Sequence, residues 1–155
     1  MSFYKRPYFQ KSKTRSRKKL DDYDYKSLVK ILDKEFGFYI KKTFEIAPGL
    51  SRCYTCGNIH ETNDIQAGHY ISRRYYIVRW DPRNVRPQCS GCNGPRAGEP
   101  LRFRVNLVED IGAKNVENLE FLARFNGERN MPREFLIEQI GIYRKLNKKL
   151  RREEL

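Results

Sequence analysis

The sequence of 155 residues contains no apolar run that approaches the roughly 18 residues needed to cross a membrane. Its Lys- and Arg-rich N-terminus has no apolar segment behind it, which argues against a secretory signal. There is no internal repeat, and no low-complexity segment beyond the basic N-terminus. These absences predict a soluble protein of the cytoplasm that makes no membrane contact.

Acidic residues are few compared with basic ones. Lys and Arg number 32 against 19 Asp and Glu, a formal net charge of +13. This excess predicts a polyanionic partner, most simply nucleic acid. Residues 1–22 are predicted to form a disordered basic arm that orders on a phosphate backbone, or else a solvated tail that only aids solubility. The binding candidates in the arm are Lys11, Lys13, Arg15, Arg17, Lys18 and Lys19.

Residues 23–155 are predicted to form one α+β domain, because a chain of this length buries a single modest core. Helical spacing of apolar residues predicts a helix over residues 25–44, with Gly37 as a point of possible interruption, and Ala47-Pro48-Gly49 ends it. Residues 50–98 show short alternating stretches typical of strands. Three further helices are predicted over residues 101–111, 113–125 and 132–152.

The last predicted helix carries an apolar stripe. Such a stripe packs in the core or, less commonly, forms a dimer interface. Its members are Leu136, Ile137, Ile140, Tyr143 and Leu146.

Four cysteines form two pairs, Cys53-Tyr-Thr-Cys56 and Cys89-Ser-Gly-Cys92. In a reducing cytoplasm such pairs favour a structural zinc site over disulfides or redox dithiols, because each pair supplies one edge of a tetrahedron. A simple zinc ribbon separates its pairs by roughly 15 to 20 residues, whereas 32 residues lie between them here. The insertion is therefore expected to carry the chemistry.

The insertion contains His69, one of only two histidines in the chain. Asn84 follows it after 14 residues, and Asn93 comes directly after the last cysteine. This spacing resembles the HNH, or ββα-metal, nuclease motif in its His-Asn-Asn form, and the zinc-braced version resembles phage endonuclease VII.

Four segments within residues 50–120 extend the resemblance to the NinG, or Rap, family of phage recombination proteins. The segments are Gln66-Ala67-Gly68-His69-Tyr70, Arg79-Trp80-Asp81-Pro82-Arg83-Asn84, Gln88-Cys89-Ser90-Gly91-Cys92-Asn93 and Arg104-Val105-Asn106-Leu107-Val108-Glu109-Asp110-Ile111-Gly112.

The resemblance implies a zinc-braced ββα-metal core, over residues 50–98, flanked by an N-terminal helix and by C-terminal helices over residues 100–152. It also implies a metal-dependent endonuclease for branched or recombining DNA, with Zn²⁺ for structure and Mg²⁺ or Mn²⁺ for catalysis. Because resolving a junction needs paired cuts, a homodimer is expected. Other recombination or replication proteins are further possible partners, in the cytoplasm of a bacterial host if a phage encodes the chain.

The residue types suit this chemistry. His69, with an ordinary pKa of about 6.5, can take a proton from water near neutral pH. Asn93 can offer an amide oxygen to Mg²⁺, and the position of Asn84 in the motif implies that it binds the loop backbone and aims His69. Simpler roles stay open: His69 as an ordinary surface or core residue, Asn84 as the end of a turn that begins at Asp81, and Asn93 as a helix cap. His60 is given no functional role.

One ligand position departs from the family pattern. Many ββα-metal enzymes place Asp or His directly before the general base, where this chain has Gly68, and similar proteins carry Asp where it has Gln66. The second ligand of the catalytic metal is therefore left among Gln66, Asp64 and Asp81. Gln66 and His69 would face opposite sides of a regular strand, so sharing a site predicts a bulge at Gly68.

Arginines inside and beside the insertion could bind phosphates. They are Arg73, Arg74, Arg83, Arg86 and Arg96. Two alternatives remain: an HNH nicking or restriction-like enzyme on ordinary duplex DNA, and a zinc-ribbon DNA-binding protein without catalysis.

Overall fold

The computed structural model describes residues 19–153. Of the basic arm, Lys19 lies within this range. A 3-10 turn, η1 (Leu20–Asp22), follows it, and Leu20 packs against the core. The predicted arm, residues 1–22, therefore includes residues that belong to the folded domain, because Leu20 packs against its apolar core. The other arm candidates, Lys11, Lys13, Arg15, Arg17 and Lys18, lie outside the described residues.

The first long helix, α1 (Tyr25–Thr43), begins where Asp24 accepts a hydrogen bond from the Ser27 backbone at 2.8 Å. It is continuous through Gly37, so the expected interruption is absent. Gly37 faces the central hairpin, where a Cβ would stand 3.7 Å from the Cβ of Ala67. The helix closes with Lys41 and Lys42 in its last turn, where positive charge suits the helix dipole.

Two small antiparallel sheets follow. The first contains β1 (Glu45–Ala47), β2 (Leu50–Arg52) and β3 (Ile59–Glu61). The second pairs β4 (Gln66–His69) with β5 (Val85–Gln88). The chain between β4 and β5 forms a four-residue helix, α2 (Tyr76–Arg79), and a 3-10 turn, η2 (Pro82–Asn84). The short helix α3 (Ser90–Asn93) follows β5, so the centre is a hairpin followed by a helix.

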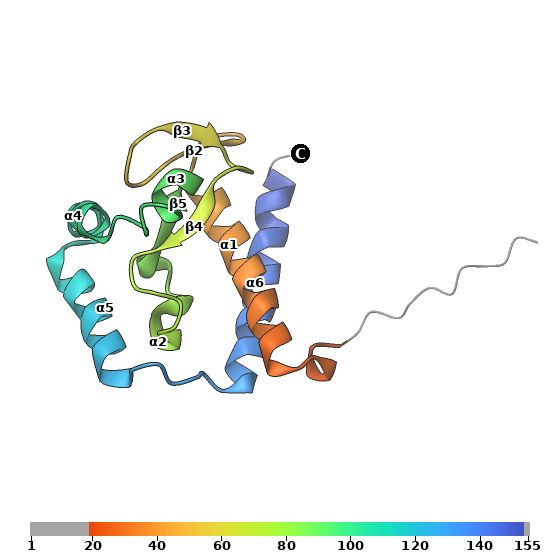
Figure 1. Cartoon of the computed structure of the whole chain (residues 1–155). Helices are drawn as coiled ribbons and strands as arrows, with labels where there is room; N and C mark the ends of the chain where they lie inside the picture. Colours follow the sequence, from red (N-terminus) through yellow and green to blue (C-terminus); the bar gives the residue numbers. More distant parts are fainter. Residues whose placement is uncertain (1–18, 154–155) are drawn as a thin grey trace, which may run out of the picture.

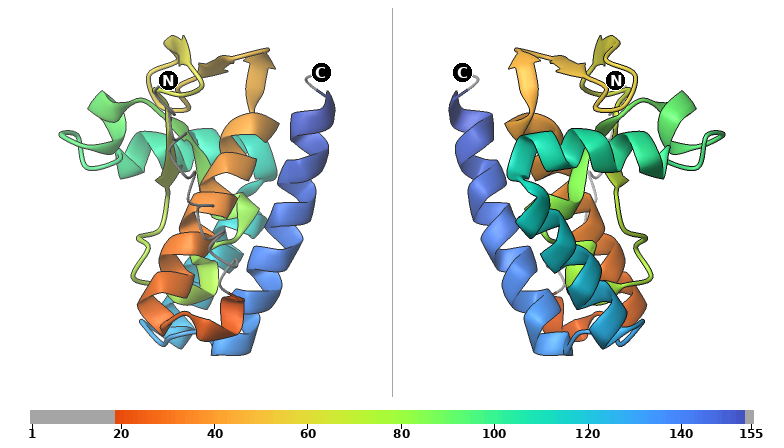
Figure 2. Two further views of the ribbon diagram at one scale, coloured as in Figure 1. Left: turned by 90° about the vertical axis from the view of Figure 1, so that its right-hand side faces the viewer. Right: turned by 90° about the vertical axis from the view of Figure 1, so that its left-hand side faces the viewer.

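Three helices complete the chain, close to the predicted ranges: α4 (Pro100–Ile111), α5 (Ala113–Asn126) and α6 (Arg133–Glu153). Helices α1 and α6 run side by side in the same direction (Figure 1). Helix α4 lies crosswise to both of them (Figure 2). The described part of the chain is therefore a mixed α+β structure whose small sheets lie among the helices.

The stripe of α6 packs in the core. Leu136, Ile140 and Tyr143 are buried with the apolar face of α1, and the Tyr143 ring meets that of Phe36 edge-on at 5.1 Å. The dimer-interface interpretation of this stripe is therefore wrong, since α1 already covers it.

A second apolar cluster joins α2, α4 and α5 through Val78, Phe103 and Leu119, and a third surrounds the cysteines. The central hairpin packs against α1, where Ala67 of β4 and Val85 of β5 join the first cluster. No helix within residues 19–153 is long and apolar enough to span a membrane.

Candidate functional site

The four cysteines converge at one end of the central hairpin. Cys53 and Cys56 come from the turn after β2, and Cys89 and Cys92 from the start and the middle of α3. All four are free thiols, and their Sγ atoms lie within 4.8 Å of one another. The Cys56 and Cys89 sulfurs are 3.9 Å apart, close to the roughly 3.8 Å between ligands of a tetrahedral zinc with Zn–S bonds of about 2.3 Å. The cluster could hold a zinc ion.

The surroundings favour a thiolate at Cys53, whereas burial raises the pKa of Cys56 and Cys92. Burial raises the pKa of the Cys53 thiol, but the backbone N–H groups of Cys56 and Cys89 outweigh it and hold that pKa below its usual value. The Arg96 guanidinium lies 3.7 Å from the Cys92 sulfur. Four thiolates leave zinc no open coordination position, so the site suits a structural role.

His69 is the last residue of β4, and its ring faces two carbonyl oxygens. Nε2 lies 2.9 Å from the Arg79 oxygen, and Nδ1 lies 3.3 Å from the Ala67 oxygen. A neutral imidazole donates only one hydrogen bond. The shorter contact favours the tautomer with the proton on Nε2, in which Nδ1 carries the lone pair that can accept a proton.

The imidazole is neutral at neutral pH. Burial lowers the pKa of His69 to about 4, and the positive charge of Arg73 adds to this effect. The bond to the Arg79 carbonyl and the charge of Asp33 act in the opposite direction. The form that accepts a proton is therefore fully populated, although the base is weaker than its ordinary pKa of about 6.5 suggested.

Asn84 ties together the loop between β4 and β5. Its Oδ1 accepts from the Ile71 backbone at 2.8 Å, and its Nδ2 donates to the carbonyls of Ile71 and Val78. Its backbone N–H also closes the turn that begins at Asp81, at 2.9 Å. Asn84 is fully buried, so it can contact loop backbone but no ligand.

The carbonyl that orients His69 is itself anchored to α1. The Arg79 guanidinium donates to both carboxylate oxygens of Asp33, at 3.0 and 2.6 Å, and Trp80 Nε1 donates to the same carboxylate at 2.9 Å. Asp33 was not predicted as part of the site, because nothing local marks a carboxylate on an amphipathic helix as the partner of a residue 46 positions away.

Asp33→Asn is expected to lower the free energy of unfolding by about 1–3 kcal/mol, because it removes a charged acceptor of three hydrogen bonds. Urea denaturation measures the change. The matched control is Glu128→Gln, which breaks the exposed pair of Glu128 with Arg74 at 3.4 Å and should cost less than about 0.5 kcal/mol. Equal losses in the two variants would contradict an anchoring role for Asp33.

Asn93 contacts Gln66, at the start of β4. Asn93 Nδ2 donates to Gln66 Oε1 at 2.6 Å, and Gln66 and His69 line the same groove. Asn93 is the last residue of α3, which begins at Ser90, so its alternative role as an N-terminal cap is wrong.

The two aspartates proposed as metal ligands lie elsewhere. The Asp81 carboxylate pairs with the Arg83 guanidinium at 2.7 Å, and Asp64 is exposed in the turn before β4. Neither lines the groove. Within residues 19–153, the cysteines are the only group of three or more His, Cys, Asp or Glu side chains close enough to share an ion. Of the three candidates for the second ligand, Gln66 alone lies beside Asn93.

Gly68 leaves room for the side chain of Gln88 in place of a ligand. The pairing of β4 with β5 is regular at all four positions, so the expected bulge is absent. A Cβ on Gly68 would stand 2.0 Å from Gln88 Oε1. Gln88 is fully buried, and its Nε2 donates to the Gly98 carbonyl at 2.9 Å. His69 reaches the groove because it lies two residues after Ala67 and so faces the same side of β4, and both residues line the groove.

Gly68→Ala is expected to lower the free energy of unfolding by about 1–3 kcal/mol through overpacking, because the bonds of Gln88 prevent its retreat. Gly37→Ala is the matched control. Its new Cβ would meet the Cβ of Ala67 at an ordinary 3.7 Å, and helix propensity should add about 0.5–1 kcal/mol of stability. Chemical denaturation of both variants measures the contrast. A stabilising Gly68→Ala would show that Gln88 does not fill this position.

A groove of about 410 Å³ lies between α1 and β4, with His69 in its wall. Lys34, Lys41 and Arg73 place three positive charges along it. Arg73 was predicted to bind phosphate, whereas the two lysines were not predicted, although their seven-residue spacing puts them on one face of α1.

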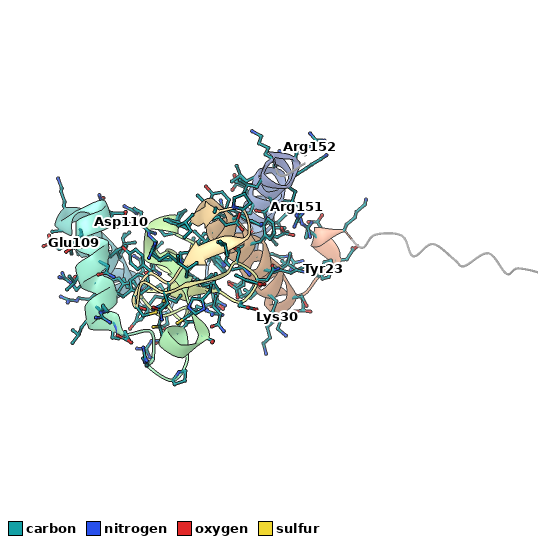
Figure 3. The ribbon with its side chains drawn as sticks, turned by 90° about the horizontal axis from the view of Figure 1, so that it is seen from above. Tyr23, Lys30, Glu109, Asp110, Arg151 and Arg152 are labelled. Atoms are coloured by element: carbon teal, nitrogen blue, oxygen red, sulfur yellow. The ribbon has the colours of Figure 1, made fainter. Side chains whose placement is uncertain are left out.

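The other proposed phosphate-binding arginines are dispersed. Arg74 is exposed near Glu128, Arg83 pairs with Asp81, and Arg96 lies beside the cysteines. Arg86 is 3% exposed and pairs with Asp110 at 2.7 Å. Its proposed role in phosphate binding is therefore wrong, since the side chain is buried and paired. Seen from above, Asp110 lies on α4, away from Arg151 and Arg152 on α6 (Figure 3).

A family model described as "Bacteriophage Lambda NinG protein" matches residues 4–154. The chain is 35% identical over 69 residues to "Protein ninG" of Salmonella phage P22, an alignment that covers 44% of this chain and 34% of that protein. It is 32% identical over 69 residues to "Protein ninG" of Escherichia phage lambda, covering 44% and 33% of the two chains. The alignments thus span about a third of the length of these curated relatives. No solved structure matches the chain significantly.

Proposed function

Because the chain belongs to the NinG family, we propose that it is a metal-dependent DNA endonuclease with a zinc-braced ββα-metal, or HNH, core. The observation that carries this proposal is the setting of His69. Its Nε2 contacts the Arg79 carbonyl, and its Nδ1 carries the lone pair that can accept a proton. The ring lines a groove that is also lined by three positively charged side chains. The hairpin β4–β5 followed by α3 supports the same core.

In the proposed reaction His69 Nδ1 takes a proton from the water that attacks the phosphorus, and the bond from phosphorus to the leaving oxygen breaks. The anionic substrate favours this transfer. A phosphate paired with Arg73 would offset the positive charge that helps to lower the pKa of His69. Asn84 holds the loop that carries the Arg79 carbonyl, and so keeps the ring oriented.

Gln66 and Asn93 are the residues that would hold the catalytic metal. A hard cation such as Mg²⁺ or Mn²⁺ binds amide oxygens. The two side chains are in contact through Asn93 Nδ2 and Gln66 Oε1 at 2.6 Å, so a shared ion would replace this hydrogen bond and require the Asn93 amide to turn its oxygen toward the ion. Such an ion would stabilise the charge that develops on the phosphate and the leaving oxygen. Because neither side chain carries a charge, the metal should bind weakly without DNA, and substrate phosphate should complete the site.

The proposed substrates are branched or recombining DNA, cut by a homodimer, with other recombination or replication proteins as further partners. The test is cleavage of a four-way junction, a fork and a linear duplex with Mg²⁺, Mn²⁺ or chelator. Preferential cutting of the branched substrates is expected. Equal cutting of the linear duplex would instead support a nicking or restriction-like enzyme.

One observation favours a second function, a zinc-ribbon DNA-binding protein without catalysis. Gln88 fills the place where many ββα-metal enzymes carry a charged ligand, and the remaining pair consists of neutral amides. Tight, salt-sensitive DNA binding with no cut product in any metal would support this alternative.

A further inference from the structure

The groove beside His69 has an apolar wall that hydrolysis does not require. Its lining includes Phe36, Phe38, Ile65 and Ala67, and its exposed lining is mostly apolar. Phosphate, water and metal are all polar, so the proposed reaction leaves this wall unexplained. A ligand that covers it must have an apolar surface of its own.

Phe38 is the ring in this wall that is not enclosed by the core. Phe36 and Tyr39, its neighbours on α1, pack against Tyr143 at 5.1 and 5.3 Å. Phe38 is half-buried, and the Arg151 guanidinium of α6 lies over its ring at 4.4 Å. The ring is thus supported from α6 and still borders the groove.

The positive charges along the groove favour an apolar ligand that also carries a negative charge. Lys34, Lys41 and Arg73 are cationic, and the carboxylate of Asp33, which also lines the groove, is already bound by Arg79 and Trp80. An anionic group joined to a flat apolar one fits this combination. A nucleotide has both parts: the phosphate meets the cations and the base meets the ring.

We propose that the groove is a nucleobase subsite, in which a base next to the phosphate being cut leaves the stack and packs against Phe38. The inference rests on the proposed nuclease function and specifies its substrate. A base inside an intact duplex must be unstacked and unpaired first, whereas one that is already unpaired costs less to extrude. The site should therefore prefer DNA with an unpaired base at the point of cutting.

Binding without added Mg²⁺ tests the subsite separately from catalysis. Fluorescence anisotropy compares two duplexes of one sequence, the first with a single unpaired adenine and the second with an abasic residue at that place. The wild-type protein should bind the first about tenfold more tightly, since stacking on an aromatic ring contributes to affinity base by base. Because the ratio compares two DNAs on one protein, partial loss of folded protein does not change it.

Phe38→Leu, which stays apolar but lacks the ring, should reduce this ratio to about one, and Phe38→Tyr should keep it. Phe125→Leu is the matched control, because Phe125 is 75% exposed on α5. A 2-aminopurine at the unpaired position should lose fluorescence on binding to wild type and not to Phe38→Leu. Equal affinity of wild type for the two duplexes, or an unchanged ratio in Phe38→Leu, would overturn the subsite.

The two proposals can fail independently. If the tenfold preference depends on Phe38 but no DNA is cut with Mg²⁺ or Mn²⁺, the subsite stands and the nuclease function is wrong. If DNA is cut while Phe38→Leu leaves both binding and the choice of cut position unchanged, the nuclease function stands and the subsite is wrong.

Discussion

His69→Ala is expected to abolish DNA cleavage in the presence of Mg²⁺, with a loss of about 10²- to 10⁴-fold in rate, the usual contribution of a positioned general base. Alanine leaves no atom to take the proton from water. In the wild-type protein the contact of Nε2 with the Arg79 carbonyl holds the ring in place, so the base is positioned before the substrate binds. Single-turnover cleavage of a labelled junction measures the rate.

His60→Ala is the matched control, because it removes the other histidine of the chain, which lies on β3 outside the groove. It should cut at the wild-type rate. Zinc content and DNA affinity of His69→Ala should equal those of wild type, which would exclude a loss of fold. Equal cleavage by wild type and His69→Ala would refute His69 as the base.

Cys53→Ser is expected to release zinc and unfold the centre of the molecule. Zinc binding by four thiolates contributes on the order of 10 kcal/mol, which is comparable to the whole stability of an ordinary domain. Cys53 is 1% exposed and packs with Ile65 and Cys92, so the third apolar cluster depends on the same side chains. Metal analysis and thermal unfolding should show both losses together.

Arg96→Ala provides a graded comparison for the zinc site. Its guanidinium lies 3.7 Å from the Cys92 sulfur and is exposed, so its removal should weaken zinc binding modestly and keep the fold. A Cys53→Ser protein that retains wild-type stability without zinc would count against a structural metal. Removing zinc from the wild-type protein with a chelator should lower its thermal stability, and adding zinc back should restore it.

The sequence predicted the long helices well because each carries its own apolar period and its own ends. Gly37 was the exception on α1. A glycine weakens a helix locally, but this one lies against Ala67 of β4, and tertiary packing outweighs the propensity. Helix α2, between β4 and β5, was not predicted, because its four residues are too few for a periodic signal.

The site was predictable where its residues are close in sequence. A Cys-x-x-Cys turn places two thiolates together by itself, so the cysteine cluster followed from spacing. Spacing could not decide which of Gln66, Asp64 and Asp81 is the second metal ligand. That choice depends on the contact of Gln66 with Asn93 of α3 and on the pairing of Asp81 with Arg83. Arg86 was misassigned for a similar reason: its partner Asp110 comes from α4, 24 residues away.

The sequence alone determined the family resemblance, the cysteine cluster, the positive charge and the order of the helices. Each of these features depends on composition or on residues that are close together in the sequence. Only the tertiary structure decided what surrounds His69. Helix α1 contributes Asp33, Lys34, Phe38 and Lys41 to the groove or its anchor, and β5 contributes the Gln88 side chain beside Gly68. These contacts join residues far apart along the chain, and such contacts form only when helices and strands pack.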